Sequence, residues 1–253
     1  MSSLLLNEKC GFLADTVAGD PTHYMFEQAL AQAELDWRFL SFEVPTDQLA
    51  TALAGLEVLG FRGVKLADAF CLEAAKTLAS LTDRARRAGS ANCLLMQADQ
   101  LTGDDTYGAA FIEAVGGSEA IADKQVVVIG SGQKARSIAS AAEAEAQVVP
   151  MTTENNKAHV PEGASVVVFA PDFDEAPRPV IDSDAAGEPI TFVDTRLRGS
   201  RTGLLKTAAE RGATVIDGVD LTAREAALTL ELWTGLEFDR APLRELAEEY
   251  LGV

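Results

Sequence analysis

Residues 124–139, KQVVVIGSGQKARSIA, carry three local signals one after another. A run of β-branched residues at 126–129 leads into the turn Gly130-Ser131-Gly132, and an alanine-rich pattern follows. A short β-branched run of this kind is typical of a strand buried in a parallel sheet. The sequence therefore predicts a strand, a tight glycine turn and the N-terminus of a helix.

The glycine turn is a candidate phosphate site, because the first turn of a helix presents backbone N–H groups at the positive end of the helix dipole. Gly130 suits a backbone with positive φ, and Gly132 lets a phosphate approach the main chain. The third glycine of the usual dinucleotide fingerprint is absent, so a βα turn that binds nothing is the alternative. The residues that we expect to contact a dinucleotide are Gly130, Ser131, Gly132, Gln133, Lys134 and Arg136.

The composition indicates a globular protein of the cytoplasm. The 253 residues, 47% of them hydrophobic, suffice for one large domain or two of ordinary size. No apolar run approaches the roughly 20 residues of a membrane span, and the start, MSSLLLNEKCGF, lacks the basic region of a secretory signal. The three scattered cysteines, Cys10, Cys71 and Cys93, form neither a disulfide framework nor a CxxC metal site.

The net charge of −18 argues against nucleic acid and anionic membranes as partners. We interpret the acidity as a solvated surface rather than a functional acidic patch. An anionic substrate or dinucleotide has to approach against this field, so local basic residues have to attract it. His23 and His159 form no catalytic triad, and we expect no metal site.

Strand and helix patterns alternate in the first part of the chain, which indicates a sheet rich in parallel strands. Asp20 suits the N-cap of the first helix, Pro21 suits its first position, and Thr46 suits the cap of the second. The expected strands are 10–18 with its exit loop, 37–44, 60–66 and 91–96, the last followed by a hairpin-like return at 99–101. The expected helices are 21–33, 46–59 and 72–81.

The pattern changes after a helix at 107–115, which ends at Gly116-Gly117. The glycine pair and the restart at Lys124 indicate a domain boundary near residues 105–120. The strands expected beyond it are 126–129, 147–150, 165–169, 190–194 and 214–216, and the expected helices are 134–144, 204–211, 223–233 and 242–250. Residues 172–189, rich in Asp, Pro and Gly, predict a loop.

Several segments together resemble the shikimate dehydrogenase family, in the family's order and spacing. They are FEVP at 42–45, GFRGV at 60–64, GSAN at 89–92, GSG at 130–132, RGATVIDG at 211–218 and ELWTG at 231–235. The resemblance covers nearly the whole chain. It implies an α/β fold with an N-terminal α/β substrate domain, residues 1–106 with 236–253, and a Rossmann-like dinucleotide-binding domain, residues 107–235. It also implies reversible hydride transfer between 3-dehydroshikimate and shikimate, a step of aromatic amino acid biosynthesis.

The resemblance assigns substrate-binding positions that are partly changed here. The family holds the substrate carboxylate with a Ser-x-Ser pair, and Asp20 and Thr22 stand at those positions. Thr22 can still donate a hydrogen bond, whereas an ionised Asp20 would repel a carboxylate. Asn92 is kept, and Glu225 stands in place of a glutamine.

The catalytic positions are also changed. The family motif Asn-Val-Thr-(apolar)-Pro-His-Lys corresponds to KLADAFC at 65–71, so the family's lysine is Cys71 here, and the aspartate that partners it is Tyr107. Ketone reduction by hydride needs a proton donor or a positive group beside the forming alkoxide. Lys65 and Tyr107 are the candidates for a rewired catalytic site. The alternatives are an ordinary strand-end lysine and a core aromatic residue with a wet hydroxyl.

The resemblance points to NAD or NADP as the cofactor. NADP-dependent members carry an arginine after the second Rossmann strand that meets the 2′-phosphate, and Thr152 stands there instead. The loss of a guanidinium favours NAD, and Glu154 lies where it could reach the ribose hydroxyls, unless it is a solvated loop residue. Binding of no dinucleotide at all stays open.

Two main functional readings follow. The first is a shikimate dehydrogenase-like NAD(P)-dependent oxidoreductase with an altered, uncharged polyol-like substrate. The second is a catalytically inactive ligand-binding or regulatory protein of the same fold, and a scaffold with a dead cleft is a third. In the first two, the partner is a small polar metabolite, and an amphipathic face on the helices of the first domain is compatible with a homodimer.

Overall fold

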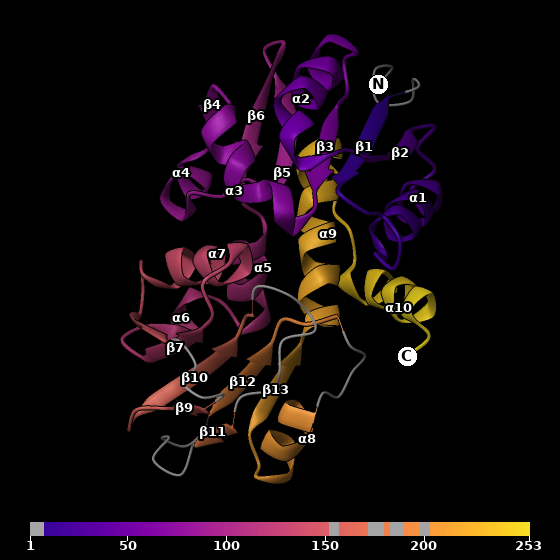
Figure 1. Ribbon diagram of the computed structural model, residues 1–253. Coiled ribbons are helices and arrows are strands. Elements are labelled where there is room, and N and C mark those ends of the chain that lie inside the picture. The colour runs from indigo at the N-terminus through magenta and orange to yellow at the C-terminus, as the bar shows by residue number, and fades with distance from the viewer. Residues whose placement is uncertain (1–7, 152–156, 172–179, 183–189, 198–202) are drawn as a thin grey trace. The chain divides into compact units, whose positions relative to one another are not determined.

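The computed structural model describes residues 8–151, 157–171, 180–182, 190–197 and 203–253, which belong to two compact units (Figure 1). Unit 1 comprises Met1–Thr106 and Ala223–Gly252, and unit 2 comprises Tyr107–Thr222 with the terminal Val253. Residues 223–235, which the sequence analysis assigns to the second domain, group with unit 1 instead. The reason is helix α9 (Gly218–Thr234), whose Trp233 indole N–H donates to the Leu94 carbonyl oxygen in the sheet of unit 1 at 2.9 Å.

The described part of unit 1 contains a six-stranded sheet in the order β2-β1-β3-β5-β6-β4. The strands are β1 (Lys9–Ala14), β2 (Arg38–Glu43), β3 (Gly63–Leu66), β4 (Ser80–Leu81), β5 (Cys93–Gln97) and β6 (Gln100–Asp104). β1 runs parallel to β2 and β3, whereas β5 is antiparallel to both β3 and β6. The start of β5 therefore lies at the same edge as the carboxyl ends of β1, β3 and β6.

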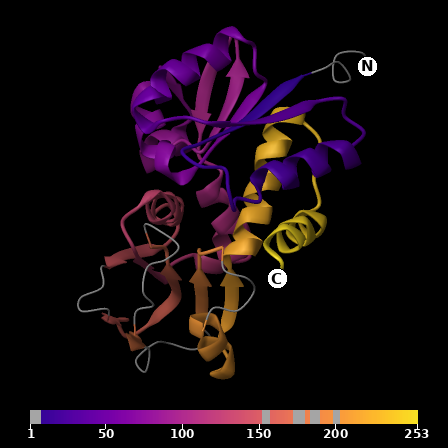
Figure 2. The ribbon, with the colours of Figure 1, turned by 45° about the vertical axis from the view of Figure 1, so that its right-hand side comes forward.

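The helices of unit 1 pack on both faces of this sheet. They are α1 (Thr22–Gln32), the 3-10 turn η1 (Thr46–Gln48), α2 (Leu49–Val58), α3 (Asp68–Thr77), α4 (Asp83–Ala88), the greater part of α9, and α10 (Arg240–Leu251). Helix α10 packs against α1, where the rings of Tyr24 and Tyr250 are 6.1 Å apart (Figure 2). In the described ranges, no helix combines the length and apolar character needed to span a bilayer.

Strand β3 shows how the sequence sorts residues between the two faces. Successive side chains of a strand point to opposite sides. Val64 and Leu66 belong to the core that β3 shares with α2 and α3. Gly63 and Lys65 face the other side, where Gly63 meets the indole of Trp233 and Lys65 meets α9.

Three local predictions in unit 1 are wrong. Helix α3 begins at Asp68 rather than at residue 72, because Ala67 is still extended and Asp68 places an acid in the first helical turn. It ends at Thr77, since Leu78 is extended and Ser80 already belongs to β4. Thr46 forms no side-chain cap, because residues 46–48 are a 3-10 turn before α2.

Asp20 is not the N-cap of α1 in the expected sense. Pro21 holds that position, and the helix begins at Thr22. The Asp20 carboxylate nevertheless accepts a hydrogen bond from the Thr22 backbone N–H at 2.8 Å. The first N–H of α1 is therefore satisfied by a carboxylate of the same chain.

Unit 2 is a parallel α/β unit. Its described residues form a five-stranded sheet in the order β13-β12-β10-β7-β8. The strands are β7 (Gln125–Ile129), β8 (Gln147–Met151), β10 (Ala164–Phe169), β12 (Thr191–Asp194) and β13 (Thr214–Asp217), and the helices are α5 (Tyr107–Ala114), α6 (Ser118–Ile121), α7 (Gln133–Ala142) and α8 (Gly203–Glu210). Val126 and Val128 pack with α5 and α7, and Val127 and Ile129 pack with α8. The strand is buried on both faces, as its continuous apolar run predicts.

The predicted loop at 172–189 is only partly described. Strand β11 (Val180–Asp182) lies inside it and pairs in parallel with β9 (Lys157–His159), so the loop prediction is wrong for these residues. The rest of the predicted loop lies outside the described residues.

Candidate active site in unit 1

The candidate active site of unit 1 lies at the sheet edge where three strands end or begin. In register across the sheet, Lys65 on β3 pairs with Cys93 on β5, and Cys93 pairs with Asp104 on β6. Asn92 directly precedes β5 and Thr106 follows β6. Helix α9 supplies the remaining polar side chains, since Glu225, Thr229 and Trp233 recur every four residues along one helical face.

Lys65 and Glu225 form a buried ion pair. The Lys65 Nζ atom is 3.0 Å from Glu225 Oε1, and both side chains are 8% exposed. The ammonium also donates to the Leu66 carbonyl oxygen at 3.1 Å. Burial alone would lower the pKa of Lys65, but the Glu225 carboxylate and other nearby acidic groups outweigh burial and hold that pKa above its ordinary value. Lys65 is therefore a buried cation at neutral pH and not a solvated strand-end lysine.

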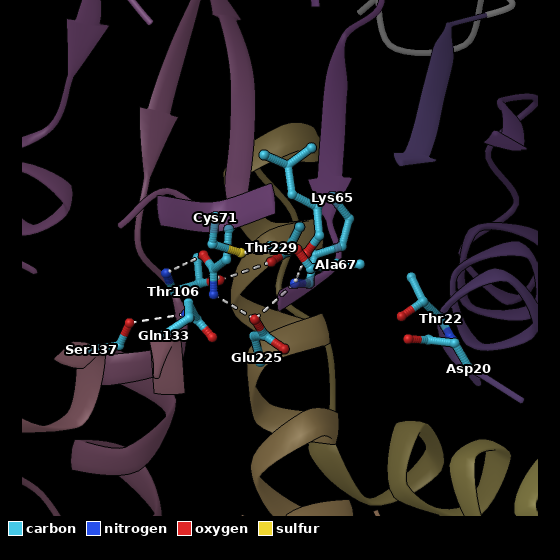
Figure 3. A network of polar contacts seen from close by, with 12 residues as sticks. Asp20, Thr22, Lys65, Ala67, Cys71, Thr106, Gln133, Ser137, Glu225 and Thr229 are labelled. Carbon is cyan, nitrogen blue, oxygen red and sulfur yellow. Dashed lines mark hydrogen bonds and ion pairs between the residues drawn. The ribbon is translucent and has the colours of Figure 1, made fainter. Parts of the chain in front are cut away.

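Asn92 connects this pair to two threonines, Thr106 and Thr229, which are labelled in Figure 3. Its Nδ2 group donates to Glu225 Oε1 at 2.5 Å. Its Oδ1 atom accepts from the Thr106 backbone N–H at 2.9 Å and from the Thr106 hydroxyl at 3.1 Å. The hydroxyls of Thr106 and Thr229 are 3.2 Å apart. Two residues of α9, one turn apart, are thus joined through Asn92 and Thr106 into one polar ring.

Cys71 does not take over the role of a lysine. Its thiol is free and buried on α3, and it donates to the Ala67 carbonyl oxygen at 3.3 Å. Burial raises the pKa of Cys71 well above the usual thiol range. The residue is a neutral thiol at physiological pH. The positive charge of this edge comes from Lys65 instead.

Asp20 and Thr22 lie apart from the Lys65–Glu225 group in Figure 3. Thr22 is buried at the start of α1, and its backbone N–H is held by the Asp20 carboxylate. A negative charge thus occupies the start of α1.

The glycine turn of unit 2 has the predicted backbone. Gly130 has a φ of +144°, and a Cβ atom there would lie 1.8 Å from the Ala170 carbonyl oxygen, so only glycine fits. Gly132 is extended with φ −74° and ψ −168°, directly before the first turn of α7. A glycine turn that opens a helix of this length fits a pyrophosphate group, because the first N–H groups of a helix have no partner within the helix.

The other cofactor candidates of unit 2 surround this turn. Gln133 Nε2 donates to Ser137 Oγ at 3.0 Å, and Arg136 Nε donates to the Ser131 carbonyl oxygen at 3.3 Å. The Lys134 ammonium lies 5.7 Å from the centre of the buried Tyr107 ring. Thr152 and Glu154 lie outside the described residues.

Sequence reasoning missed several polar residues. Thr106 and Thr229 complete the ring around Asn92, and the signal for Thr229 is its place four residues after Glu225 on a predicted helix. In unit 2, Arg196 pairs with Asp194 through bonds of 2.9 and 2.6 Å and lies 4.9 Å from the Phe169 ring. Both residues of this pair are buried directly at the end of β12. Among the described residues, no group of three His, Cys, Asp or Glu side chains could hold a metal.

Comparison with known proteins relates this chain to one family. The family description "Shikimate dehydrogenase substrate binding domain" matches residues 16–94. The shikimate dehydrogenase (NADP(+)) of Herminiimonas arsenicoxydans is 26% identical over 93% of this chain and 95% of that protein. The shikimate dehydrogenase (NADP(+)) of Pyrobaculum islandicum is 28% identical over 85% of this chain and 88% of that protein.

Solved structures share the whole fold. Shikimate 5-dehydrogenase from Thermus thermophilus, in complex with shikimate, matches with a TM-score of 0.82 and 25% identity over 97% of this chain and 100% of that one. The 5-ketofructose reductase of Gluconobacter sp. strain CHM43 matches with a TM-score of 0.83 and 23% identity over 96% and 99%. The fold is that of a two-domain α/β protein with a substrate-binding and a Rossmann-like domain. Along nearly its whole length the chain is similar to shikimate dehydrogenases, and residues 16–94 match the substrate-binding domain of that family.

Proposed function

We propose that this chain is an NAD(P)-dependent reductase of small polar carbonyl compounds, in which the Lys65 ammonium replaces the family's Lys/Asp pair. The observation that carries the proposal is the buried contact of 3.0 Å between Lys65 Nζ and Glu225 Oε1. Carbonyl reduction develops negative charge on the substrate oxygen, and a fixed ammonium can stabilise this charge and then donate a proton. Lys65 sits at the sheet edge where the family resemblance places the substrate.

The role of the Rossmann-like unit is to bind the hydride donor. A dihydronicotinamide bound there would supply the hydride for reduction of the carbonyl carbon. The residues for its pyrophosphate are the turn Gly130–Gly132 and the start of α7, with Lys134 and Arg136 as the nearby cations. The curated relatives use NADP(+), and the threonine in place of the arginine for the 2′-phosphate favours NAD here.

The protonation state of Lys65 suits it to assist reduction at neutral pH. The pKa of Lys65 is held above its ordinary value, so the ammonium form dominates at neutral pH. The ammonium serves reduction, in which a proton goes to the alkoxide. Oxidation of an alcohol needs the neutral amine as a base, and this form is scarce while Glu225 is ionised.

A substrate that fits this site has no carboxylate to place at the start of α1. The Thr22 N–H already binds the Asp20 carboxylate, and a second carboxylate there would meet a like charge. An uncharged polyol-like ketone meets neither obstacle, because its hydroxyls can donate to Asp20. One structural relative is named 5-ketofructose reductase, after a keto sugar, which supports such a substrate for this fold.

The enzyme acts in the cytoplasm on a small polar metabolite, without nucleic acid or membrane, and a homodimer is its proposed assembly. The strong negative charge of the chain supports the exclusion of nucleic acid and anionic membranes as partners.

The second candidate function is a ligand-binding protein without turnover. The feature that favours it is that Glu225 Oε1 already accepts two hydrogen bonds from within the chain, from Lys65 and Asn92. A site with internally satisfied groups can bind a metabolite without assisting its reduction.

Thermal-shift titration combined with an activity panel separates the two. NAD, NADP, NADH and NADPH are titrated, and oxidation of NADH and NADPH is followed with ketoses, 3-dehydroshikimate and other small ketones. A ligand that binds only the folded protein raises its melting temperature. The reductase proposal expects stabilisation by a dinucleotide and turnover of an uncharged ketone. Stabilisation by metabolites without turnover of any ketone would support the binder instead.

A further inference from the structure

The carboxamide of Asn92 has a fixed orientation. Its Oδ1 atom is held by two donors of one residue, the backbone N–H and the hydroxyl of Thr106. An asparagine whose oxygen is fixed in this way must present its NH2 group to the opposite side. On that side lies Glu225, at 2.5 Å from Nδ2. Asn92 is 1% exposed and Glu225 is 6% exposed, so little water competes for these bonds.

The direction of the hydrogen bonds follows from the number of protons. The Thr106 hydroxyl has one proton and gives it to Asn92 Oδ1, so the 3.2 Å contact requires Thr229 to donate to Thr106. The chain of donors therefore runs from Thr229 through Thr106 to Asn92 and ends on Glu225. Each member donates one hydrogen bond to the next, and the final acceptor is the Glu225 carboxylate, which pairs with Lys65.

We propose that Asn92 is a positioning residue, which Thr106 orients so that its NH2 group holds the Glu225 carboxylate against Lys65. The catalytic consequence rests on the reductase function proposed above, whereas the orientation of Asn92 does not. Without this bond the Glu225 carboxylate loses a buried contact that fixes its rotamer. A carboxylate that turns away by one rotamer no longer aims the ammonium at the substrate oxygen.

The first test is spectroscopic and needs no substrate. The side-chain NH2 signal of Asn92, assigned by its loss in Asn92→Leu, is followed by NMR in the full chain. We expect a downfield signal with slow solvent exchange, and at least about tenfold faster exchange in Thr106→Val and Glu225→Leu. Thr106→Val removes a donor to Asn92 Oδ1, and Glu225→Leu removes the acceptor of the Asn92 NH2 group. Thr106→Ser keeps the hydroxyl and should keep the signal. Thr102→Val is the matched control, because Thr102 is a buried threonine on β6 that takes no part in the described ring.

Two outcomes of this test would overturn the inference. One is an Asn92 signal that is unchanged in Thr106→Val and Glu225→Leu. The other is an equal loss of protection in the Thr102→Val control, which would mean general loosening of the unit.

The second test uses the substrate that the activity panel identifies. A positioning residue affects kcat more than KM, so Asn92→Leu should lower kcat by about 10- to 100-fold with KM nearly unchanged. In the Glu225→Leu background the same substitution should add little, because Asn92 acts through Glu225. A rise in KM with unchanged kcat would instead make Asn92 a substrate ligand. If the NMR result is as expected and no ketone is reduced, the orientation of Asn92 toward Glu225 is confirmed and the reductase proposal fails.

Discussion

The indole of Trp233 lies directly over Gly63: a Cβ atom at Gly63 would be 2.2 Å from the indole Nε1 atom. The same indole N–H donates to Leu94, and the Trp233 carbonyl oxygen accepts from Arg62 Nε at 3.1 Å. The ring therefore anchors the end of α9 to strands β3 and β5. Glu225 lies two turns earlier on the same face of α9. The Trp233 anchor therefore also fixes where Glu225 lies along the helix axis relative to Lys65.

Gly63→Ala tests this anchor. The new methyl group overlaps a ring that is buried and hydrogen-bonded, so we expect a loss of about 1–3 kcal/mol in the free energy of unfolding. Urea denaturation measures it. Gly55→Ala on α2 is the matched control, since a Cβ there meets nothing within 4 Å. Its helical position predicts a gain of about 0.5–1 kcal/mol. Equal effects of the two substitutions would contradict the packing argument.

Glu225→Gln tests the buried ion pair. The substitution keeps the shape of the side chain and leaves the Lys65 ammonium buried without its counter-charge, which should cost about 3 kcal/mol of unfolding free energy. Adding Lys65→Met removes the ammonium that has lost its counter-charge, so the double variant should regain much of the lost unfolding free energy. Denaturant titration of the two single variants and the double variant measures the coupling. Strict additivity of the two single effects would show that the pair contributes no coupling.

The acid stability of unit 1 depends on Asp104 and Arg84. Arg84 donates to both carboxylate oxygens of Asp104, at 2.6 and 2.5 Å. Burial alone would raise the pKa of Asp104, but the bonds from Arg84 and Thr82 outweigh burial and lower it. A lowered pKa means that the stabilisation is present above the unfolded value of about 3.9 and is lost as the pH falls through the lower folded value.

Asp104→Asn should therefore cost about 1–3 kcal/mol at pH 7, and the difference from the parent chain should shrink below about pH 4. Urea denaturation at a series of pH values measures this. Asp83→Asn is the control, because the Asp83–Arg86 pair is exposed and such pairs contribute less than about 1 kcal/mol. A penalty for Asp104→Asn that does not change with pH would contradict the assignment.

Asp20→Ser tests the exclusion of carboxylates. The substitution removes the negative charge at the start of α1 and restores the residue type that the family uses, so shikimate should stabilise the variant more than the parent chain. A gain of about tenfold in affinity is expected, and thermal-shift titration with shikimate measures it. The exposed Asp47→Ser is the control for the change in net charge. Equal shikimate binding by all three proteins would show that Asp20 does not select the substrate.

The fold class could be predicted because the signals are periodic and local. Val126–Ile129 indicated a parallel strand, and the glycine turn indicated a helix start. Shorter elements gave no such signal: the two-residue strand β4 and the short helix α4 were missed because neither is long enough to show a period. The sequence pattern predicts the start of α3 too late, because Asp68 and Phe70 lie in the segment 65–71 that resembles the family motif, which hides the first helical turn.

The site could be predicted only residue by residue. Family resemblance drew attention to Lys65, Asn92 and Glu225 separately, but not to their contact, because the three lie on β3, before β5 and on α9. Only the antiparallel placement of β5 and the anchoring of α9 bring them together. Thr106 gives no sequence signal, and the spacing of Thr229 from Glu225 does not by itself distinguish it, because threonine is common and the role of both residues depends on what lies opposite.

The assistance of carbonyl reduction by the Lys65 ammonium is tested by NAD(P)H oxidation in the Lys65→Met variant, with the ketone that the parent chain reduces. Methionine keeps the length of the side chain and removes the charge. We expect a loss of kcat of about 10²- to 10⁴-fold, with dinucleotide binding retained. A Lys65→Met variant that reduces the ketone at the rate of the parent chain would contradict this role of Lys65.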